Sequence, residues 1–177
     1  MKRLIITLML AIAVFALPEA ALGRPAAENA IEQDNKNTPS AENVIKYCKY
    51  YIATLPSDDP QQEELRKNVM AQITIFAINT DKFVLSVGGE MELVREASDK
   101  CNYPELLGVF ISGEVLYCLE HNLSESNAAS FVSAMQDVLN HYSRLPEHKA
   151  KSLNKYLDMD DAKRAQALEK YYNKNHG

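Results

Sequence analysis

The amino-acid sequence predicts an all-α protein, built as a single-domain antiparallel helical bundle of about five to six helices. Apolar side chains recur at steps of three and four along most of residues 41–172, as on the buried face of an amphipathic helix. Prolines and capping residues stand where several of these stretches begin. Of the 177 residues, 46% are hydrophobic and 24% are charged, which is the composition of a globular protein rather than of a disordered or collagen-like chain.

The first 23 residues have the three parts of a secretory signal peptide. A positive start at Lys2 and Arg3 is followed by an apolar stretch over 4–17 and by small residues up to Gly23. The apolar stretch is too short to span a bilayer comfortably, so a signal anchor is the less favoured alternative. No later stretch has spanning length, and no cysteine lies just beyond the first one to carry a lipid. We therefore expect cleavage before Arg24 and an exported protein, periplasmic or secreted, without a transmembrane segment.

The mature chain that remains after this cleavage is acidic and has the size of one domain. It has 154 residues and a formal net charge of −6, with 17 basic and 23 acidic residues. A chain of this length buries about 68–70% of its unfolded surface, enough for one core. The acidic balance argues against nucleic acid as a partner, because phosphate binding needs clustered lysines and arginines. Residues 24–40 hold one large apolar side chain and are expected to form a flexible leader to the helical domain at 41–177.

Two helices are predicted in the first half of this domain. On a helical wheel the apolar residues of 41–55 fall within one arc, with Lys46 and Tyr50 on the opposite side. These apolar residues are Val44, Ile45, Cys48, Tyr51, Ile52 and Leu55. After a proline-rich break, Asp59 occupies the N-cap position of a second helix over about 60–79, whose first residue is a proline. The core stripe of this second helix consists of Leu65, Val69, Ile73 and Phe76.

The segment from 73 to 87 allows two interpretations. Its two β-branched runs are separated by four residues, a spacing that suits a β-hairpin and would make the fold α+β. We favour helices, because the stripe of the second helix runs unbroken into Ile73 and the connection lacks the glycine that hairpin turns prefer. A third helix is then predicted over about 82–98, strained at Gly88-Gly89, because glycine costs up to about 1 kcal/mol per helical position. Its buried face would consist of Phe83, Val87, Met91 and Val94.

The helix that begins after Pro104 is apolar around almost its whole circumference, as expected of a central helix buried among others. Gly108 and Ser112 lie one turn apart on it and would let a neighbouring backbone approach closely. The helix ends near His121, and Ser124 is expected to cap the next one. That next helix has the cleanest amphipathic pattern of the chain, with core positions Ala128, Phe131, Met135, Val138, Tyr142 and Leu145.

The C-terminal part is predicted to contain a short helical turn and a last helix. Leu153, Tyr156 and Leu157 indicate the turn, and Asp160 is expected to cap the last helix. The acidic run at 158–161 begins like a calcium loop, but the glycine and the distal glutamate of such a loop are missing, so capping explains it better. The apolar side chains of the last helix are Ala165, Leu168 and Tyr172.

Glu114, Cys118 and His121 are the side chains considered for catalysis or metal binding. They follow one another at steps of four and three on the predicted central helix, within about 60° of arc on a helical wheel. A thiolate beside an imidazole is a nucleophile that a carboxylate can orient, and the same groups offer sulfur, nitrogen and oxygen to zinc.

A structural role for these three residues is preferred. No second cluster completes a metal shell, because the other histidines stand in separate stretches, at His141, His148 and His176. Cys118 is then expected to pack as a small hydrophobe, and His121 to lie at a helix C-terminus where its charge is favourable. Glu114 is expected to pair with an arginine such as Arg66 or Arg95. No catalytic residue, cofactor or metal is therefore predicted.

The three cysteines, Cys48, Cys101 and Cys118, are expected to remain unbonded. One disulfide is the alternative, because an exported chain meets an oxidising compartment. Residues 104–118 span about 21 Å along a straight helix, whereas a disulfide needs Cα atoms within roughly 7 Å, so a Cys101–Cys118 bond is excluded. A bond from Cys48 to either of the others stays open, with Cys101 the preferred partner.

The stretch from 104 to 120 resembles a group of small exported helical proteins from Bacteroidota that have no assigned activity. The resemblance rests on Pro-Glu-Leu-Leu at 104–107 and on Phe110, Gly113, Tyr117 and Leu119-Glu120. In loose pattern it extends over residues 41–172, although the three cysteines have no place in that pattern. It implies an all-α fold and export, and it carries no functional residue over.

Two functional hypotheses follow. The preferred one is an exported, non-enzymatic helical module that binds a protein, a peptide or an envelope component in a groove between helices. A contiguous exposed groove with apolar or tyrosine side chains would support it. The alternative is a small periplasmic enzyme or metal site that uses Glu114, Cys118 and His121, which requires these side chains in one open pocket.

Overall fold

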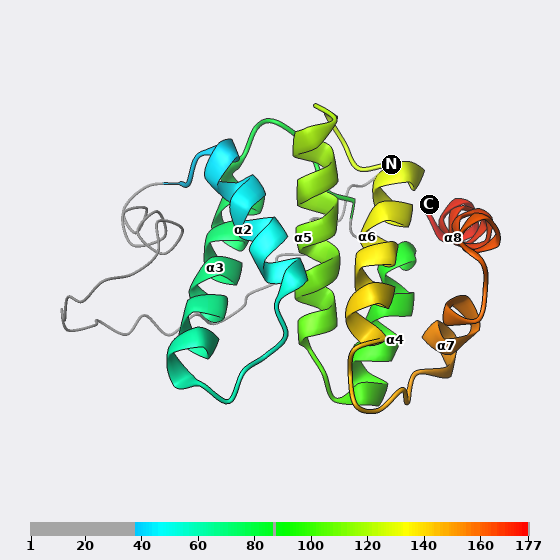
Figure 1. Ribbon diagram of the computed structural model, residues 1–177. Helices are drawn as coiled ribbons and strands as arrows, with labels where there is room; N and C mark the ends of the chain where they lie inside the picture. Colours follow the sequence, from blue (N-terminus) through cyan, green and yellow to red (C-terminus); the bar gives the residue numbers. More distant parts are fainter. Residues whose placement is uncertain (1–37, 87, 177) are drawn as a thin grey trace.

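Helices dominate the part of the chain that the structure, a computed structural model, describes, residues 38–86 and 88–176 (Figure 1). Within these residues there are seven α-helices, one short 3₁₀ helix and one isolated β-bridge. The all-α prediction is therefore confirmed, with seven helices where about five to six were expected. The predicted signal peptide at 1–23 and residues 24–37 of the predicted leader lie outside the described residues.

Helix α5 is the centre of the fold and packs against α2, α3, α4 and α6. In Figure 1 it stands between α2 and α6, with α3 and α4 behind them, while α8 is seen nearly end-on beside α6 and so crosses it steeply. This arrangement confirms the prediction of a central helix. The helices are α2 (Ala41–Ala53), α3 (Pro60–Asn79), α4 (Glu92–Cys101), α5 (Glu105–Glu120), α6 (Ala128–Tyr142), α7 (Lys151–Leu157) and α8 (Asp161–Asn175).

The first two helices lie close to their predicted bounds. Ser40 caps α2, its hydroxyl accepting a hydrogen bond from the Asn43 backbone N–H at 3.3 Å, and Asp59 caps α3 in the same manner. Tyr47 of α2 is buried although the predicted stripe did not include it, whereas Ile45 lies only half-buried at the edge. The core face of α2 is therefore turned slightly from the arc that the apolar residues alone define.

The predicted helix over 82–98 is wrong in its first half. Residues 83–86 are extended, and Val84 forms a parallel bridge with Glu125 in the connection between α5 and α6. The Val84 N–H donates to the Ser124 carbonyl at 3.0 Å, and the Val84 carbonyl accepts from the Ser126 N–H at 2.9 Å. The hairpin alternative is also absent, because this segment pairs with a connection about 40 residues later and not with residues 73–78.

Gly88-Gly89 does not lie inside an α-helix as predicted; Gly88 precedes the 3₁₀ helix Gly89–Met91, which runs directly into α4. A Cβ atom on Gly89 would lie 2.7 Å from the carbonyl oxygen of Asn175, so a side chain here would collide with the end of α8. The second glycine therefore permits a close approach between distant parts of the chain. Helix α4 also continues beyond residue 98, the predicted end, to Cys101, and Asn102 follows it in the left-handed conformation, at φ 50°.

Two glycines of α5 bring its neighbours unusually near. A Cβ atom on Gly113 would lie 2.8 Å from the Cα atom of Ala134 in α6. On another side, a Cβ atom on Gly108 would lie 2.6 Å from the Tyr51 hydroxyl oxygen in α2. The prediction of a close approach at Gly108 is confirmed, although a tyrosine side chain makes the contact there and not a backbone.

Helix α6 is capped by Asn127 and not by Ser124 as predicted. The Asn127 side chain accepts from the backbone N–H groups of Ala129 and Ser130, and the Ser130 hydroxyl accepts from the Asn127 N–H. Four of the six predicted core positions, Phe131, Met135, Val138 and Tyr142, are fully buried. The two outer positions, Ala128 and Leu145, are only half-buried, and Leu145 lies beyond the end of α6.

Asp160 caps α8 as predicted, its carboxylate accepting from the Lys163 N–H at 2.9 Å. This bond agrees with the capping role preferred for the acidic run at 158–161. Along the described stretches, none of the helices combines the length and the apolar character needed to cross a bilayer.

Candidate functional site

The three side chains singled out in the sequence do not meet in one open site. Glu114 and Cys118 are buried on α5, whereas His121 is exposed just after it. Burial, together with the nearby charge of Glu114, raises the pKa of the Cys118 thiol to about 11, so the thiol carries its proton at neutral pH. A protonated, buried thiol is not a nucleophile, and Cys118 behaves as the small hydrophobic residue that was preferred.

The His121 imidazole is engaged with its own helix. Its ring stacks on that of Tyr117, with 3.9 Å between centroids, and its Nδ1 lies 3.0 Å from the Tyr117 carbonyl oxygen. Among the residues that the structure describes, no hydrogen bond joins it to Cys118, and no three acidic, cysteine or histidine side chains are grouped so that they could hold a metal ion. His121 therefore acts at the helix C-terminus, and neither it nor Cys118 lines the pockets described below.

The predicted pairing of Glu114 with an arginine is wrong. Arg95 lies on the surface with Glu92 and Asp99, and the Arg66 guanidinium lies over the Tyr51 ring, 4.1 Å from its centroid. Glu114 is 5% exposed, and its Oε2 has no hydrogen-bond partner within the described part of the chain. Burial raises the pKa of Glu114 to about 7, opposed by a hydrogen bond with Ser130 and reinforced by the charge of Glu90.

A second group of buried polar side chains lies around Arg66 of α3. Arg66 is 3% exposed, and none of its side-chain nitrogens has a hydrogen-bond partner in the described residues. Nearby, His141 is fully buried with its Nε2 3.2 Å from the Tyr103 hydroxyl oxygen, and burial lowers its pKa to about 4. His141 is thus not isolated as the sequence suggested, but no described pocket opens onto this cluster.

The three thiols are free, as expected. Cys48 and Cys118 are buried in the core, and Cys101 is half-buried at the end of α4. Burial also raises the pKa of Cys48. All three therefore pack as small hydrophobic side chains.

Polar and aromatic side chains from three separate parts of the chain line a pocket of about 410 Å³ between the start of α6 and the end of α8. Val84 and Ser86 of the extended segment form one wall, and residues 125–128 form another. Tyr172 and His176 of the C-terminal region complete the lining. The Val84–Glu125 bridge positions the first two walls, because it ties the extended segment to the turn before α6.

His176 links this pocket to a buried carboxylate. Its Nδ1 lies 3.7 Å from Oε2 of Glu90 and 3.5 Å from the Ser86 hydroxyl, while its ring stacks on Tyr172 with 4.4 Å between centroids. Glu90 is 2% exposed, and its Oε1 accepts a hydrogen bond from the Gly88 N–H at 3.0 Å. Burial raises the pKa of Tyr172, and the charges of Glu90, Glu114 and Glu125 raise it further. Three carboxylates are thus close enough to Tyr172, a lining residue of the pocket, to influence its pKa.

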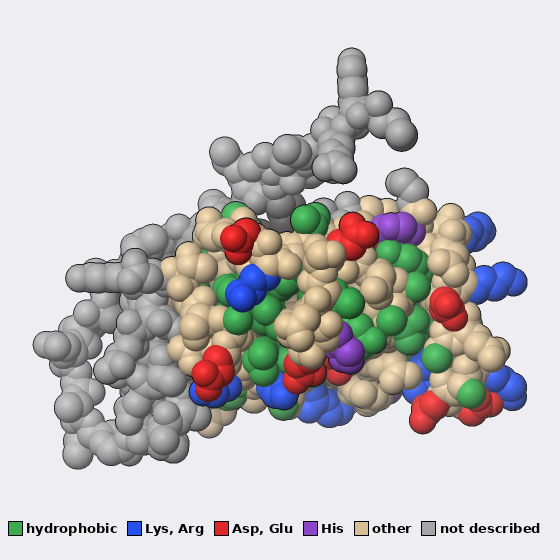
Figure 2. All heavy atoms as spheres, turned by 90° about the horizontal axis from the view of Figure 1, so that it is seen from above, with side chains coloured by type: hydrophobic (Ala, Val, Ile, Leu, Met, Phe, Trp, Pro, Cys, Tyr) green, Lys and Arg blue, Asp and Glu red, His purple; other side chains and the backbone are tan. Residues whose placement is uncertain are grey.

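A second hollow, of about 300 Å³, adjoins this pocket along the line where α6 faces α8. Ala128 lines both hollows, which are therefore neighbours, and we call them together the α6–α8 groove. Its remaining lining is Ala129, Val132, Ala165, Gln166 and Glu169. Figure 2 looks down on the end of the molecule where α6 begins, and hydrophobic side chains gather on this face with acidic, basic and histidine side chains around them.

Sequence patterns did not identify Glu90, Tyr172 and His176 as members of one site. Glu90 lies more than 80 residues from both of the others, and each looked like an isolated polar or core residue. The sequence feature most closely related to this site was the glycine pair before Glu90, because the end of α8 approaches the chain there. Glu114 alone carries over from the predicted set to the surroundings of the pocket.

No protein-family model, no curated protein and no solved structure matches this chain. The resemblance to exported proteins from Bacteroidota therefore stays a prediction.

Replacing Glu114 by glutamine is expected to stabilise the protein at neutral and alkaline pH but not in acid. The native pKa of about 7 exceeds the ordinary 4.5, so the unfolded chain ionises first and stability falls as pH rises through this window. The variant removes that penalty, which corresponds to roughly 2–3 kcal/mol above the native pKa. Denaturant unfolding of both proteins across the pH range measures this difference.

The comparison between the two proteins isolates Glu114 from other titrating groups. Asp137, whose pKa burial raises to about 6, acts in the same direction, whereas His141, kept neutral by burial, lowers stability as pH falls. Both remain in the variant and cancel in the difference. Glu64→Gln, on the exposed face of α3, is the matched control and should show no pH-dependent gain. A Glu114→Gln effect that is the same in acid and in alkali would contradict the assignment.

Proposed function

We propose that this protein is an exported, non-enzymatic module that binds a protein or peptide segment in the α6–α8 groove. The observation that carries the proposal is that two hollows lie next to each other, sharing Ala128, with linings that extend from Gln166 on α8 to the extended segment. Val84 and Val132 line it on the apolar side, and Tyr172 adds an aromatic ring with a hydroxyl. Such a mixture of apolar walls and few polar groups is typical of binding sites.

The exposure of Val84 supports a macromolecular ligand. Its side chain is 69% exposed at the edge of the groove, one of two large hydrophobic side chains that the described residues expose strongly. The other, Ile78, lies at the end of α3, away from the groove lining. Val84 lines a hollow with both apolar and polar side chains, which suits contact with a peptide or protein segment.

Export, the class of partner and the absence of catalysis in this proposal are supported by the sequence and by the environments of the candidate catalytic residues. Export is supported by the signal-peptide pattern of residues 1–23, and a non-nucleic-acid partner by the acidic composition. The catalytic alternative has less support, because Cys118 is buried and protonated and His121 bonds to its own helix.

Site-specific photo-crosslinking in living cells tests this function. A photoreactive phenylalanine derivative in place of Val132 should give a discrete crosslinked product, because this position faces the groove. The same derivative in place of the exposed Ile78 should give none. The protein recovered from the same cells should begin at Arg24, which checks the exported part of the proposal by N-terminal sequencing.

A second substitution separates occupancy of the groove from chance contact. Ala129→Trp places a large ring in the groove and should remove the product at position 132, whereas Ala162→Trp, on an exposed part of α8 outside the groove lining, should leave it. Equal crosslinking at positions 132 and 78, or a product that persists in Ala129→Trp, would refute a binding role of this groove.

A further inference from the structure

The turn between α5 and α6 contains a sequence motif that neither the fold nor the proposed function uses. This motif is Asn122-Leu123-Ser124, the only Asn-X-Ser/Thr stretch of the chain. It is the acceptor pattern for N-linked sugars, provided that it lies on the surface of an exported protein. A capping role would account for Ser124 without a sugar, but Asn127 caps α6 instead. The serine hydroxyl therefore has no role as a cap.

Both functional groups of the motif lie on the surface. Asn122 and Ser124 are exposed in the turn that follows α5, at the end of the molecule where α6 begins (Figure 1). Among the described residues, neither side chain has a hydrogen-bond partner. Ser124 uses its backbone carbonyl, which accepts from the Val84 N–H at 3.0 Å. A sugar on Asn122 would therefore break no hydrogen bond within the described part of the fold.

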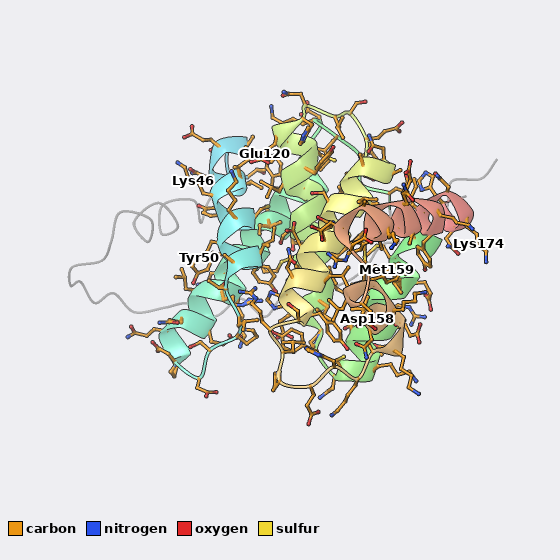
Figure 3. All side chains as sticks on the ribbon, turned by 45° about the vertical axis from the view of Figure 1, so that its right-hand side comes forward. Lys46, Tyr50, Glu120, Asp158, Met159 and Lys174 are labelled. Atoms are coloured by element: carbon orange, nitrogen blue, oxygen red, sulfur yellow. The ribbon has the colours of Figure 1, made fainter. Side chains whose placement is uncertain are left out.

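The side chains next to the asparagine are engaged elsewhere. The Glu120 carboxylate pairs with Lys49 of α2 at 2.7 Å, and Figure 3 shows Glu120 near the end of α5, on the side of α2. The His121 ring stacks on that of Tyr117. Leu123, in the middle of the motif, is half-buried and packs against the core. These contacts hold the turn in place and leave the carboxamide and the hydroxyl of the motif available to an enzyme.

The backbone of this turn accounts for an asparagine but not for the serine. Asn122 has φ 51°, in the left-handed region that asparagine tolerates at the end of a helix. Asn102 follows α4 in the same conformation, at φ 50°, and is also exposed. There, Pro104 stands where the motif needs a hydroxyl. The two turns thus share their backbone geometry and differ in the acceptor sequence.

We propose that Asn122 carries an N-linked oligosaccharide, which an oligosaccharyltransferase transfers from a polyprenyl diphosphate donor. Asn122 Nδ2 forms a bond to the anomeric carbon of the first sugar and loses one proton. The bond from that carbon to the diphosphate oxygen breaks, and the lipid diphosphate leaves with the electron pair. The Ser124 hydroxyl is the group by which the enzyme recognises the acceptor. The proposal rests on the exported part of the proposed function, because this transfer takes place outside the cytoplasm.

Mass spectrometry of the protein recovered from the cells that naturally produce it tests this assignment. Trypsin cleaves after Lys100 and Arg144 and at no position between them, so one peptide, 101–144, contains both asparagines. Fragmentation of this peptide should place the sugar on Asn122 and leave Asn102 unmodified. Asn102 is thus a control within the same molecule, because it has the same conformation and exposure without the motif.

Three variants separate recognition of the motif from an effect on folding. Asn122→Gly removes the carboxamide and suits the left-handed backbone, and Ser124→Ala removes only the hydroxyl, so both should abolish the sugar. Ser124→Thr preserves the acceptor pattern and should keep it. When both are produced without sugar, Ser124→Ala and the unchanged protein should unfold at the same denaturant concentration, because no described residue bonds to this hydroxyl.

An unmodified peptide from a chain that begins at Arg24 would overturn the sugar site and leave export intact. A sugar on Asn102, or a sugar on Asn122 that persists in Ser124→Ala, would also overturn it. A chain that retains its signal peptide and carries no sugar would overturn both export and the sugar site. The crosslinking at position 132 is measured independently, because it depends on the α6–α8 groove. Failure of the sugar site and failure of the binding function are therefore distinguishable.

Discussion

Replacing Phe131 by alanine is expected to lower the free energy of unfolding by about 3–5 kcal/mol, the range for truncating a fully buried aromatic side chain. Phe131 is completely buried at the place where three helices meet. Its ring lies 5.8 Å from that of Phe110 on α5, and 5.4 and 6.1 Å from those of Tyr172 and Tyr171 on α8, centroid to centroid. The loss is a large share of a typical total stability of about 5–15 kcal/mol.

The position of Phe131 also connects stability to the candidate site. Its ring supports Tyr172, which lines the pocket, so the variant should lose the crosslinked product at position 132 even under conditions where it stays folded. Denaturant unfolding measures the first effect and photo-crosslinking the second. Ile78→Ala is the control, because that side chain is 74% exposed and its loss should change stability by no more than about 0.5 kcal/mol. A loss below about 1 kcal/mol for Phe131→Ala would mean that α8 does not pack on α6 as described.

Gly113→Ala is expected to destabilise the protein by about 1–3 kcal/mol, although alanine is the better helix former. The added methyl group would lie 2.8 Å from the Cα atom of Ala134 and 3.0 Å from its Cβ atom. These are backbone and short side-chain atoms of α6, which move only if the two helices separate. The gain in helix propensity, up to about 1 kcal/mol, offsets only part of that cost.

Gly88→Ala is the matched comparison for this prediction. The nearest atom to a methyl group there is the end of the Glu90 side chain, at 2.9 Å, which adjusts more easily than a backbone. Thermal and denaturant unfolding of both variants should therefore show the smaller loss for Gly88→Ala. A neutral or stabilising Gly113→Ala would show that α5 and α6 are further apart than their contact implies.

The sequence predicts best those features of the fold that depend on residues close together in the chain. The centre of the core face of α6 was predicted, because Phe131, Met135 and Val138 repeat at the helical period and that period is visible within one window. The burial of Leu139 and His141 was not predicted, because they lie beside this stripe and are covered by other segments. Asp59 and Asp160 were identified as caps for the same reason, since a cap bonds to N–H groups two or three residues away. Ser124 was misassigned because its carbonyl, not its hydroxyl, is used, and the bond is to Val84.

Contacts between residues far apart in the sequence determine those parts of the fold that local sequence patterns do not predict. The extended conformation of residues 83–86 comes from hydrogen bonds to residues 124–126, against a local pattern that suits a helix. Likewise, the buried state of Glu114 was not visible in its neighbours on the helical wheel. The groups near it, the hydroxyl of Ser130 and the like-charged Glu90, come from other segments, so the arginine partners suggested by charge alone were wrong.

The sequence by itself thus determined the all-α class, the central place of the helix at 105–120 and the buried face of α6, because each follows from side-chain periodicity within one helix. Only the tertiary structure showed which side chains come together in the candidate site. Glu90, Tyr172 and His176 meet because the glycine before Glu90 lets the end of α8 approach and because Val84 pairs with Glu125. These contacts join residues 40 to 90 positions apart, and their geometry depends on helix packing that no single stretch of sequence encodes.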